Sequence, residues 1–106
     1  AALGDIGKHF PDNDPAYKGI DSLLLLAKVG EILAAHHYAV NNIGPTIVAQ
    51  RPKLASYIPE MRAKIADVLN LELDKVSIKA TTTEGLGFTG EGLGIAAYAV
   101  CTLTEI

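Results

Sequence analysis

The segment from Lys79 to Gly90 contains the residue types that bind phosphate. Three threonines, Thr81 to Thr83, end an apolar run that starts at Val76, and Glu84 follows them directly. Threonine hydroxyls and exposed backbone N–H groups bind phosphate oxygens, and a neighbouring carboxylate holds a divalent cation. The alternative is a threonine-rich strand end that runs into a flexible glycine loop, because a single glycine-rich loop is a weak signal. Other parts of the chain must decide between the two.

Two further segments carry polar groups that suit a ligand site. Glycines and prolines interrupt the stretch from Asp5 to Asp21, which is expected to be an ordered loop. Its carboxylates either bind a metal or substrate hydroxyls, or they form turns and face solvent. Farther along, Ala49–Leu54 closes an expected strand with two cations and a proline. This piece is either a rigid solvated turn or a loop that presents backbone groups to a ligand.

Composition limits the function classes. The 106 residues fit a single domain, 1–106, and the net charge of −3 gives no basic footprint for nucleic acid. No apolar run approaches the roughly 20 residues of a membrane span. Apolar residues make up 49% of the chain and the mean hydropathy is +0.25, which favours an oligomer that hides part of the surface. The single cysteine, Cys101, lies in an apolar run and is expected to pack there in a reducing compartment.

Hydrophobic periodicity predicts an α/β sandwich whose helices cover one face of a sheet. Pro45 removes a backbone donor from its strand, so that strand is expected at an edge or with a bulge. Ala1–Leu3 resembles the last turn of a helix that begins earlier, which predicts a missing N-terminal portion. In chain order, the predicted elements are a helix over 23–37 capped by Asp21 or Ser22, a strand over 43–50, a helix from Ser56 or Tyr57 with Pro59 in its first turn, a strand over 76–82, and a strand over 95–104.

Four motifs together resemble one family. They are Ala2–Gly7, Phe10–Pro15, Ala49–Leu54 and Lys79–Glu84, and the likeness covers the whole chain. The family resembled is 2-C-methyl-D-erythritol 2,4-cyclodiphosphate synthase, of the non-mevalonate isoprenoid pathway. The resemblance implies conversion of a cytidine-diphosphate derivative of methylerythritol 2-phosphate into the cyclic diphosphate, with release of CMP. It also implies a mixed β-sheet with helices packed on one face, a homotrimer with active sites between subunits, and a cytoplasmic location, or a plastid or apicoplast location if the source is eukaryotic.

The resemblance also implies roles for individual residues. Thr82 matches the family's catalytic hydroxyl, and Glu84 matches the ligand of a magnesium or manganese ion. The Ala49–Ala55 loop would bind cytosine through backbone groups, and the Phe10–Asp14 loop would line the methylerythritol phosphate end. The substrate-binding residues implied in this way are Asp5, Ile6, Gly7, Phe10, Pro11, Asp12, Asn13, Asp14, Ala49, Gln50, Arg51, Pro52, Lys53, Leu54, Ala55, Thr81, Thr82, Thr83, Glu84 and Phe88.

The chain departs from the family pattern in two respects. Family members also use zinc, whose Asp-x-His pair and further histidine lie upstream of Ala1, and His9, His36 and His37 do not match those positions. The resemblance therefore implies that residues 1–106 are an N-terminally truncated synthase domain, which corresponds to the C-terminal two thirds of the family's protein. Glu91 stands where many relatives carry an arginine at the trimer axis, so what binds at that axis is open. Two alternatives to the enzyme remain, a non-catalytic nucleotide- or phosphate-binding module and a trimerising fragment.

Overall fold

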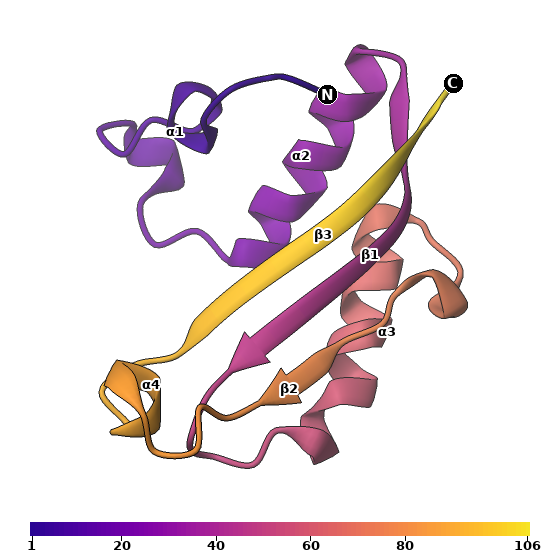
Figure 1. Cartoon of the computed structure of the whole chain (residues 1–106). Helices are drawn as coiled ribbons and strands as arrows, with labels where there is room; N and C mark the ends of the chain where they lie inside the picture. Colours follow the sequence, from indigo (N-terminus) through magenta and orange to yellow (C-terminus); the bar gives the residue numbers. More distant parts are fainter.

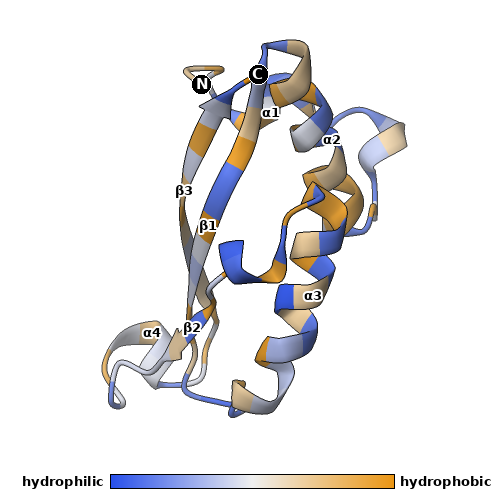
Figure 2. Ribbon diagram, turned by 90° about the vertical axis from the view of Figure 1, so that its right-hand side faces the viewer, coloured by the Kyte–Doolittle hydropathy of each residue, from blue (hydrophilic) through white to orange (hydrophobic).

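A computed structural model describes all residues, 1–106, and its centre is a three-stranded mixed sheet in the order β2-β1-β3 (Figure 1). The central strand β1 (Tyr38–Val48) pairs in parallel with β2 (Lys79–Thr81) and antiparallel with β3 (Ala96–Glu105). Helices α2 (Ser22–Ala35) and α3 (Ile58–Leu69) lie on the same side of this sheet (Figure 2). The predicted mixed sheet with helices on one face is confirmed.

The helix α2 begins where the sequence predicted. The carboxylate of Asp21 accepts a hydrogen bond from the N–H of Leu23 across 2.8 Å, which satisfies one of the free donors of the first turn. The helix ends at Ala35, two residues before the predicted end, because His37 takes a left-handed conformation with φ of 65°. That reversal of direction starts β1 at Tyr38, five residues earlier than predicted.

The helix α3 packs over the core of the molecule. A 3-10 turn over Ala55–Tyr57 precedes it, and Pro59 lies in its first turn as predicted. Arg62 donates from Nε to the carbonyl of Val76 (2.7 Å) and from Nη2 to the carbonyl of Leu73 (2.9 Å), which ties the helix to the 3-10 turn Leu73–Lys75. The buried residues of this cluster are Ala66, Val76 and Ile78, of which Val76 is fully buried. The half-buried residues packed around them are Ile43, Ile47, Ile58, Met61, Ile65 and Leu71.

The expectation that Pro45 marks an edge or a bulge is wrong, because β1 is the central strand and its register shift lies between Val40 and Asn42. Ile43 accepts a hydrogen bond from Ser77, so the backbone of Pro45, two residues on, also faces β2. Proline offers no donor there, and the pairing stops after an isolated bridge at Ile43 and resumes at Thr46. For this reason β2 covers only three of the seven residues predicted over 76–82.

The remaining differences concern short elements. Residues 1–5 contain no helix, so the predicted helical turn at Ala1–Leu3 is absent from the structure. The loop after Asp5 contains a short helix, α1 (Ile6–His9), and a 3-10 turn (Pro15–Tyr17), while the glycine-rich loop contains α4 (Gly87–Gly90). None of these helices, nor any other in the chain, combines the length and apolar character needed to span a membrane.

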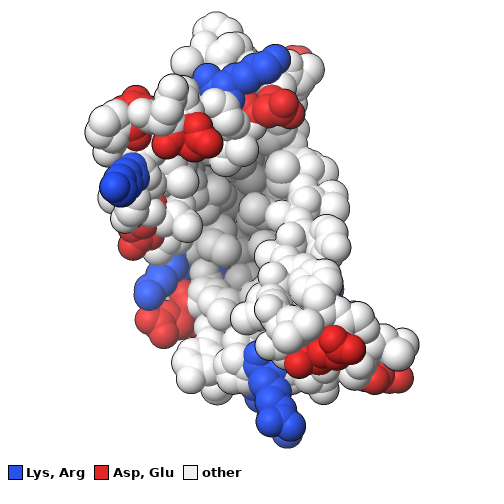
Figure 3. Space-filling model, turned by 90° about the vertical axis from the view of Figure 1, so that its left-hand side faces the viewer, with Lys and Arg blue, Asp and Glu red and all other residues white.

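Strand β3 leaves a large apolar surface uncovered. Tyr98 and Val100 are 68% and 76% exposed, and the free cysteine Cys101 is exposed as well, so its predicted packing role is wrong for this chain by itself. The strand has no charged residue between Ala96 and Thr104. Figure 3 views the molecule from the side on which the β3 edge of the sheet lies, and shows a hollow whose Lys, Arg, Asp and Glu side chains lie around its margin. Such a surface is typical of a site of association.

Candidate functional site

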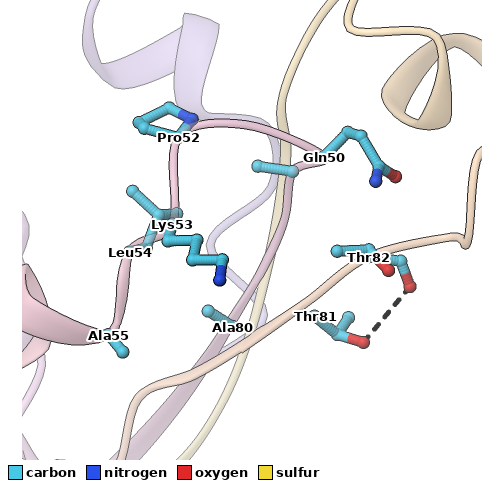
Figure 4. Close-up of a pocket in the computed structure, with 9 residues that line it drawn as sticks. Gln50, Pro52, Lys53, Leu54, Ala55, Ala80, Thr81 and Thr82 are labelled. Atoms are coloured by element: carbon cyan, nitrogen blue, oxygen red, sulfur yellow. Dashed lines mark hydrogen bonds between the residues drawn. The ribbon is translucent and has the colours of Figure 1, made fainter.

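The loops that follow β1 and β2 leave the sheet at the same end. The two strands are parallel and Val48 pairs with Thr81, so the residues after each strand lie opposite each other. Between these loops is a pocket of about 220 Å³ (Figure 4). The residues that line it are Ala49, Gln50, Pro52, Lys53, Leu54, Ala55, Ala80, Thr81 and Thr82. Two of the segments singled out in the sequence therefore form one cavity.

Lys53 and two threonines line this pocket. The Lys53 side chain extends across it, with its amino group directed toward Ala80 and Thr81 (Figure 4). The hydroxyl of Thr81 donates to the carbonyl of Thr82 across 3.3 Å, so its proton is engaged by the main chain. The Thr82 oxygen instead accepts a hydrogen bond from the N–H of Glu84 at 3.2 Å. Because a hydroxyl also has one proton to give, Thr82 retains a free donor for an incoming oxyanion.

The turn after the threonines has a strained and closely packed backbone. Glu84 and Gly85 have φ values of 55° and 83°, both in the left-handed region. A Cβ on Gly90 would lie 2.2 Å from the carbonyl carbon of Gly85, so only glycine permits this approach of the two backbone segments. The turn therefore fixes the backbone of Glu84, two residues after the pocket-lining Thr82, and its side chain is exposed.

Thr83 has other partners. Its hydroxyl donates to the carbonyl of Leu86 and lies 3.1 Å from the hydroxyl of Thr89. Thr89 is only 4% exposed and is the one buried polar residue of the chain. The sequence implied a diphosphate contact for Thr83 and no role for Thr89, whereas both hydroxyls are used to fold the turn. In the sequence, the only sign of this contact is the six-residue spacing of Thr83 and Thr89, the second of which lies in the short helix α4.

Gln50 joins the two loops. Its Oε1 accepts a hydrogen bond from the N–H of Gly85 across 3.2 Å. Arg51 does not line the pocket of Lys53. It lines a separate hollow without hydrophobic residues, together with Gln50, Gly90, Glu91 and Gly92. Phe88 is 57% exposed and its ring lies against Gly94, outside the lining of the first pocket.

The other predicted substrate residues lie in the N-terminal loop region, far from the pocket at the α4 end of the sheet (Figure 1). Asp14 caps the 3-10 turn by accepting from the N–H of Ala16 at 2.9 Å, so the turn-forming alternative holds for this residue. Phe10 packs edge-on against Tyr17, with ring centroids 5.4 Å apart. Asp5 and Asp12 are exposed. The others in this group are Ile6, Gly7, Pro11 and Asn13, and they too are exposed.

The donor groups suit one of the two implied metals. The structure has no group of three or more His, Cys, Asp or Glu side chains placed to hold an ion. A tight zinc site needs such a group, and the histidines are engaged separately, His9 with the carbonyl of Leu3 and His36 with that of Ile32. The residues of this chain do not fit zinc. Magnesium is commonly held by one or two carboxylates together with water and substrate phosphates, so Glu84 beside Thr82 fits it.

Known proteins match the chain over its whole length. The model of the YgbB family matches residues 1–104. The 2-C-methyl-D-erythritol 2,4-cyclodiphosphate synthase of Clostridium perfringens is 59% identical over 105 residues, which are 99% of this chain and 67% of that protein.

Solved structures agree. The bifunctional IspDF of Campylobacter jejuni superimposes with a TM-score of 0.92 at 36% identity, over 98% of this chain and 28% of that one. A Plasmodium falciparum IspF described as a CDP complex gives a TM-score of 0.81 at 28% identity, over 96% of this chain and 60% of that one. These matches support the synthase interpretation over a non-catalytic module or a trimerising fragment. With both a family model and a close relative matching it almost from end to end, the chain belongs to the YgbB family, that of 2-C-methyl-D-erythritol 2,4-cyclodiphosphate synthase.

Proposed function

We propose that this chain supplies the cytidine- and diphosphate-binding part of a cyclodiphosphate synthase, a phosphorus–oxygen lyase. The reaction converts a CDP-linked methylerythritol 2-phosphate into the cyclic diphosphate and CMP. The observation that carries the proposal is that one pocket is lined by Lys53 from one loop and by Thr81 and Thr82 from the opposite loop. A cation and hydroxyls around one cavity suit a diphosphate.

The chemistry asks little of the protein beyond positioning and charge stabilisation. An oxygen of the substrate's 2-phosphate attacks the β-phosphorus, the bond to the CMP phosphate breaks, and CMP leaves with that electron pair. No protein nucleophile is needed. Lys53 offsets the charge of the diphosphate, while the free hydroxyl proton of Thr82 donates to an oxygen on which charge develops. The Ala49–Ala55 loop offers backbone groups to cytosine.

The proposal also includes a divalent cation at the diphosphate. Glu84 would hold a magnesium or manganese ion, which supplies charge neutralisation at the phosphates when bound. The exposed position of the carboxylate and its adjacency to Thr82 support this assignment. Zinc, if the whole protein uses it, needs ligands from outside these residues.

A homotrimer with active sites between subunits accounts for two features of the chain. Asp5 and the Phe10–Asp14 loop lie at the end of the folded molecule opposite the pocket (Figure 1). They would therefore contact a nucleotide bound to a neighbouring subunit, not one bound to their own. The uncharged, exposed surface of β3 gives an assembly an apolar area to bury. Bacterial relatives favour a cytoplasmic location.

Calorimetric titration with CMP tests this function. We expect CMP to bind and AMP to bind at least tenfold more weakly, because backbone donors and acceptors of the Ala49–Ala55 loop that pair with cytosine would be left unpaired by adenine. A Lys53→Ala variant should lose about threefold to tenfold of the CMP affinity. Equal binding of the two nucleotides, or of neither, would contradict the proposal.

A further inference from the structure

We infer that Gln50 is a positioning residue that couples the nucleotide loop to the metal-binding turn. Occupation of the Ala49–Ala55 loop and binding of a cation at Glu84 then strengthen each other. The inference rests on the proposed function, because it takes that loop as the cytidine site and Glu84 as the metal ligand.

The coupling contact is the hydrogen bond from the N–H of Gly85 to Gln50 Oε1, 3.2 Å long. It joins residues 35 positions apart, and it is the one side-chain hydrogen bond between the 49–55 loop and the 81–90 segment. The half-buried Gln50 directly follows Ala49, which is buried and bonded through its N–H to the carbonyl of Thr81. The main chain at Gln50 is therefore fixed at its start, and its side chain spans from one loop to the other.

The contact acts on Glu84 because of the peptide plane that it holds. The Gly85 N–H belongs to the peptide unit whose carbonyl is that of Glu84, so the bond to Gln50 orients this unit. Thr82 holds the other side of Glu84, by accepting from its N–H. Between these two tethers Glu84 takes a φ of 55°, which a residue other than glycine adopts only when its surroundings require it. The hydrogen bond from Gly85 to Gln50 is the contact through which the nucleotide loop helps to hold Glu84 in this conformation.

Thermodynamic linkage gives the consequence. A nucleotide that fixes the 49–55 loop also fixes Gln50, and thereby favours the Glu84 orientation that binds the cation. The cation must then raise nucleotide affinity by the same factor. The glutamine amide has the length to make this contact, whereas asparagine is one methylene shorter and falls short of Gly85.

The test is a set of calorimetric titrations of the protein with CMP without metal, and with CDP in the presence and absence of saturating MgCl₂. The ratio of the two CDP affinities is the metal-dependent gain. Gln50→Ala and Gln50→Asn should lower this gain about threefold to tenfold, as expected for one neutral hydrogen bond. Gln50 also lines the pocket, so CMP affinity is measured beside the gain; a loss of binding common to both CDP titrations cancels in their ratio. The matched control Ser56→Ala, just beyond the same loop and without a bond to the turn, should keep both values.

The outcomes separate the inference from the function on which it rests. If both Gln50 variants keep the wild-type gain, or lose CMP affinity and thermal stability together with it, the coupling role is overturned and Gln50 is a structural or direct binding residue. Gln50→Asn retains an amide of similar size, so it provides the answer if Gln50→Ala does not fold. If the wild-type protein fails to bind CMP, the proposed function itself fails and the inference falls with it.

Discussion

The N–H of Glu84 donates a hydrogen bond to the Thr82 hydroxyl oxygen across 3.2 Å. This contact joins the residue proposed to stabilise the transferring phosphate to the residue proposed to hold the metal. It uses a lone pair of Thr82 and leaves the hydroxyl proton free. It also fixes the backbone of Glu84 on one side, so the Thr82 hydroxyl and the main chain of the proposed metal ligand are held together.

Glu84→Gln should remove most of the effect of magnesium on CDP binding. The amide keeps the size and the backbone of Glu84 but takes away the negative charge that a hard cation prefers. We expect the metal-dependent gain in CDP affinity to fall about tenfold or more, while CMP affinity without metal stays within about twofold. Titration calorimetry measures both. Glu91→Gln removes a charge from the same segment and serves as the control; an equal loss in that variant would show that net charge, not ligation, matters.

Thr83→Val should destabilise the protein, although it changes little in shape. The hydroxyl of Thr89, 4% exposed, would lose its partner, and an unsatisfied buried hydroxyl costs about 1–3 kcal/mol. Thr82→Val removes an exposed hydroxyl and should change stability by less than about 1 kcal/mol. Urea unfolding at one protein concentration compares the two variants. A larger loss for Thr82→Val would contradict the division of roles between the neighbouring threonines.

Gly90→Ala and Gly30→Ala should change stability in opposite directions. A methyl group on Gly90 would meet the backbone of Gly85 at 2.2 Å, and relieving that overlap costs about 1–3 kcal/mol. At Gly30, inside α2, the nearest atom would be Leu69 Cδ2 at an ordinary 3.6 Å, so alanine should stabilise by about 0.5–1 kcal/mol. Thermal unfolding of both variants is the measurement. An unchanged melting temperature for Gly90→Ala would show that the turn is not packed as described.

Local signals explain which elements the sequence predicted. The Asp21 cap and the Pro59 start depend on contacts within one turn of helix, and both were readable from residue types. The order of the strands in the sheet could not be predicted from residue types. Pro45 was expected at an edge because its missing donor is a local property, but its place in the central strand depends on where Val76 and Lys79 pair with β1.

In the candidate site, too, local residue patterns were predictable and contacts set by the fold were not. Motif spacing singled out the loop at Lys53 and the threonines as separate segments, and parallel pairing of β1 with β2 brings them to one pocket. The contacts of Thr89 and Gln50 connect residues to partners whose position only the fold decides. The N-terminal carboxylates fitted the family pattern equally well, yet the chain keeps them away from the pocket.

The most direct test of the central claim is the rate of CMP release by Thr82→Ala and Thr82→Ser, measured with saturating CDP-linked methylerythritol 2-phosphate. Loss of one preorganised donor to a developing charge lowers turnover about 10²–10³-fold, and serine restores that donor. The account therefore predicts a loss of this size in Thr82→Ala, activity within about tenfold of wild type in Thr82→Ser, and an unchanged melting temperature in both. Near-normal CMP release by a folded Thr82→Ala protein would contradict the assignment of Thr82 and, with it, the proposed site.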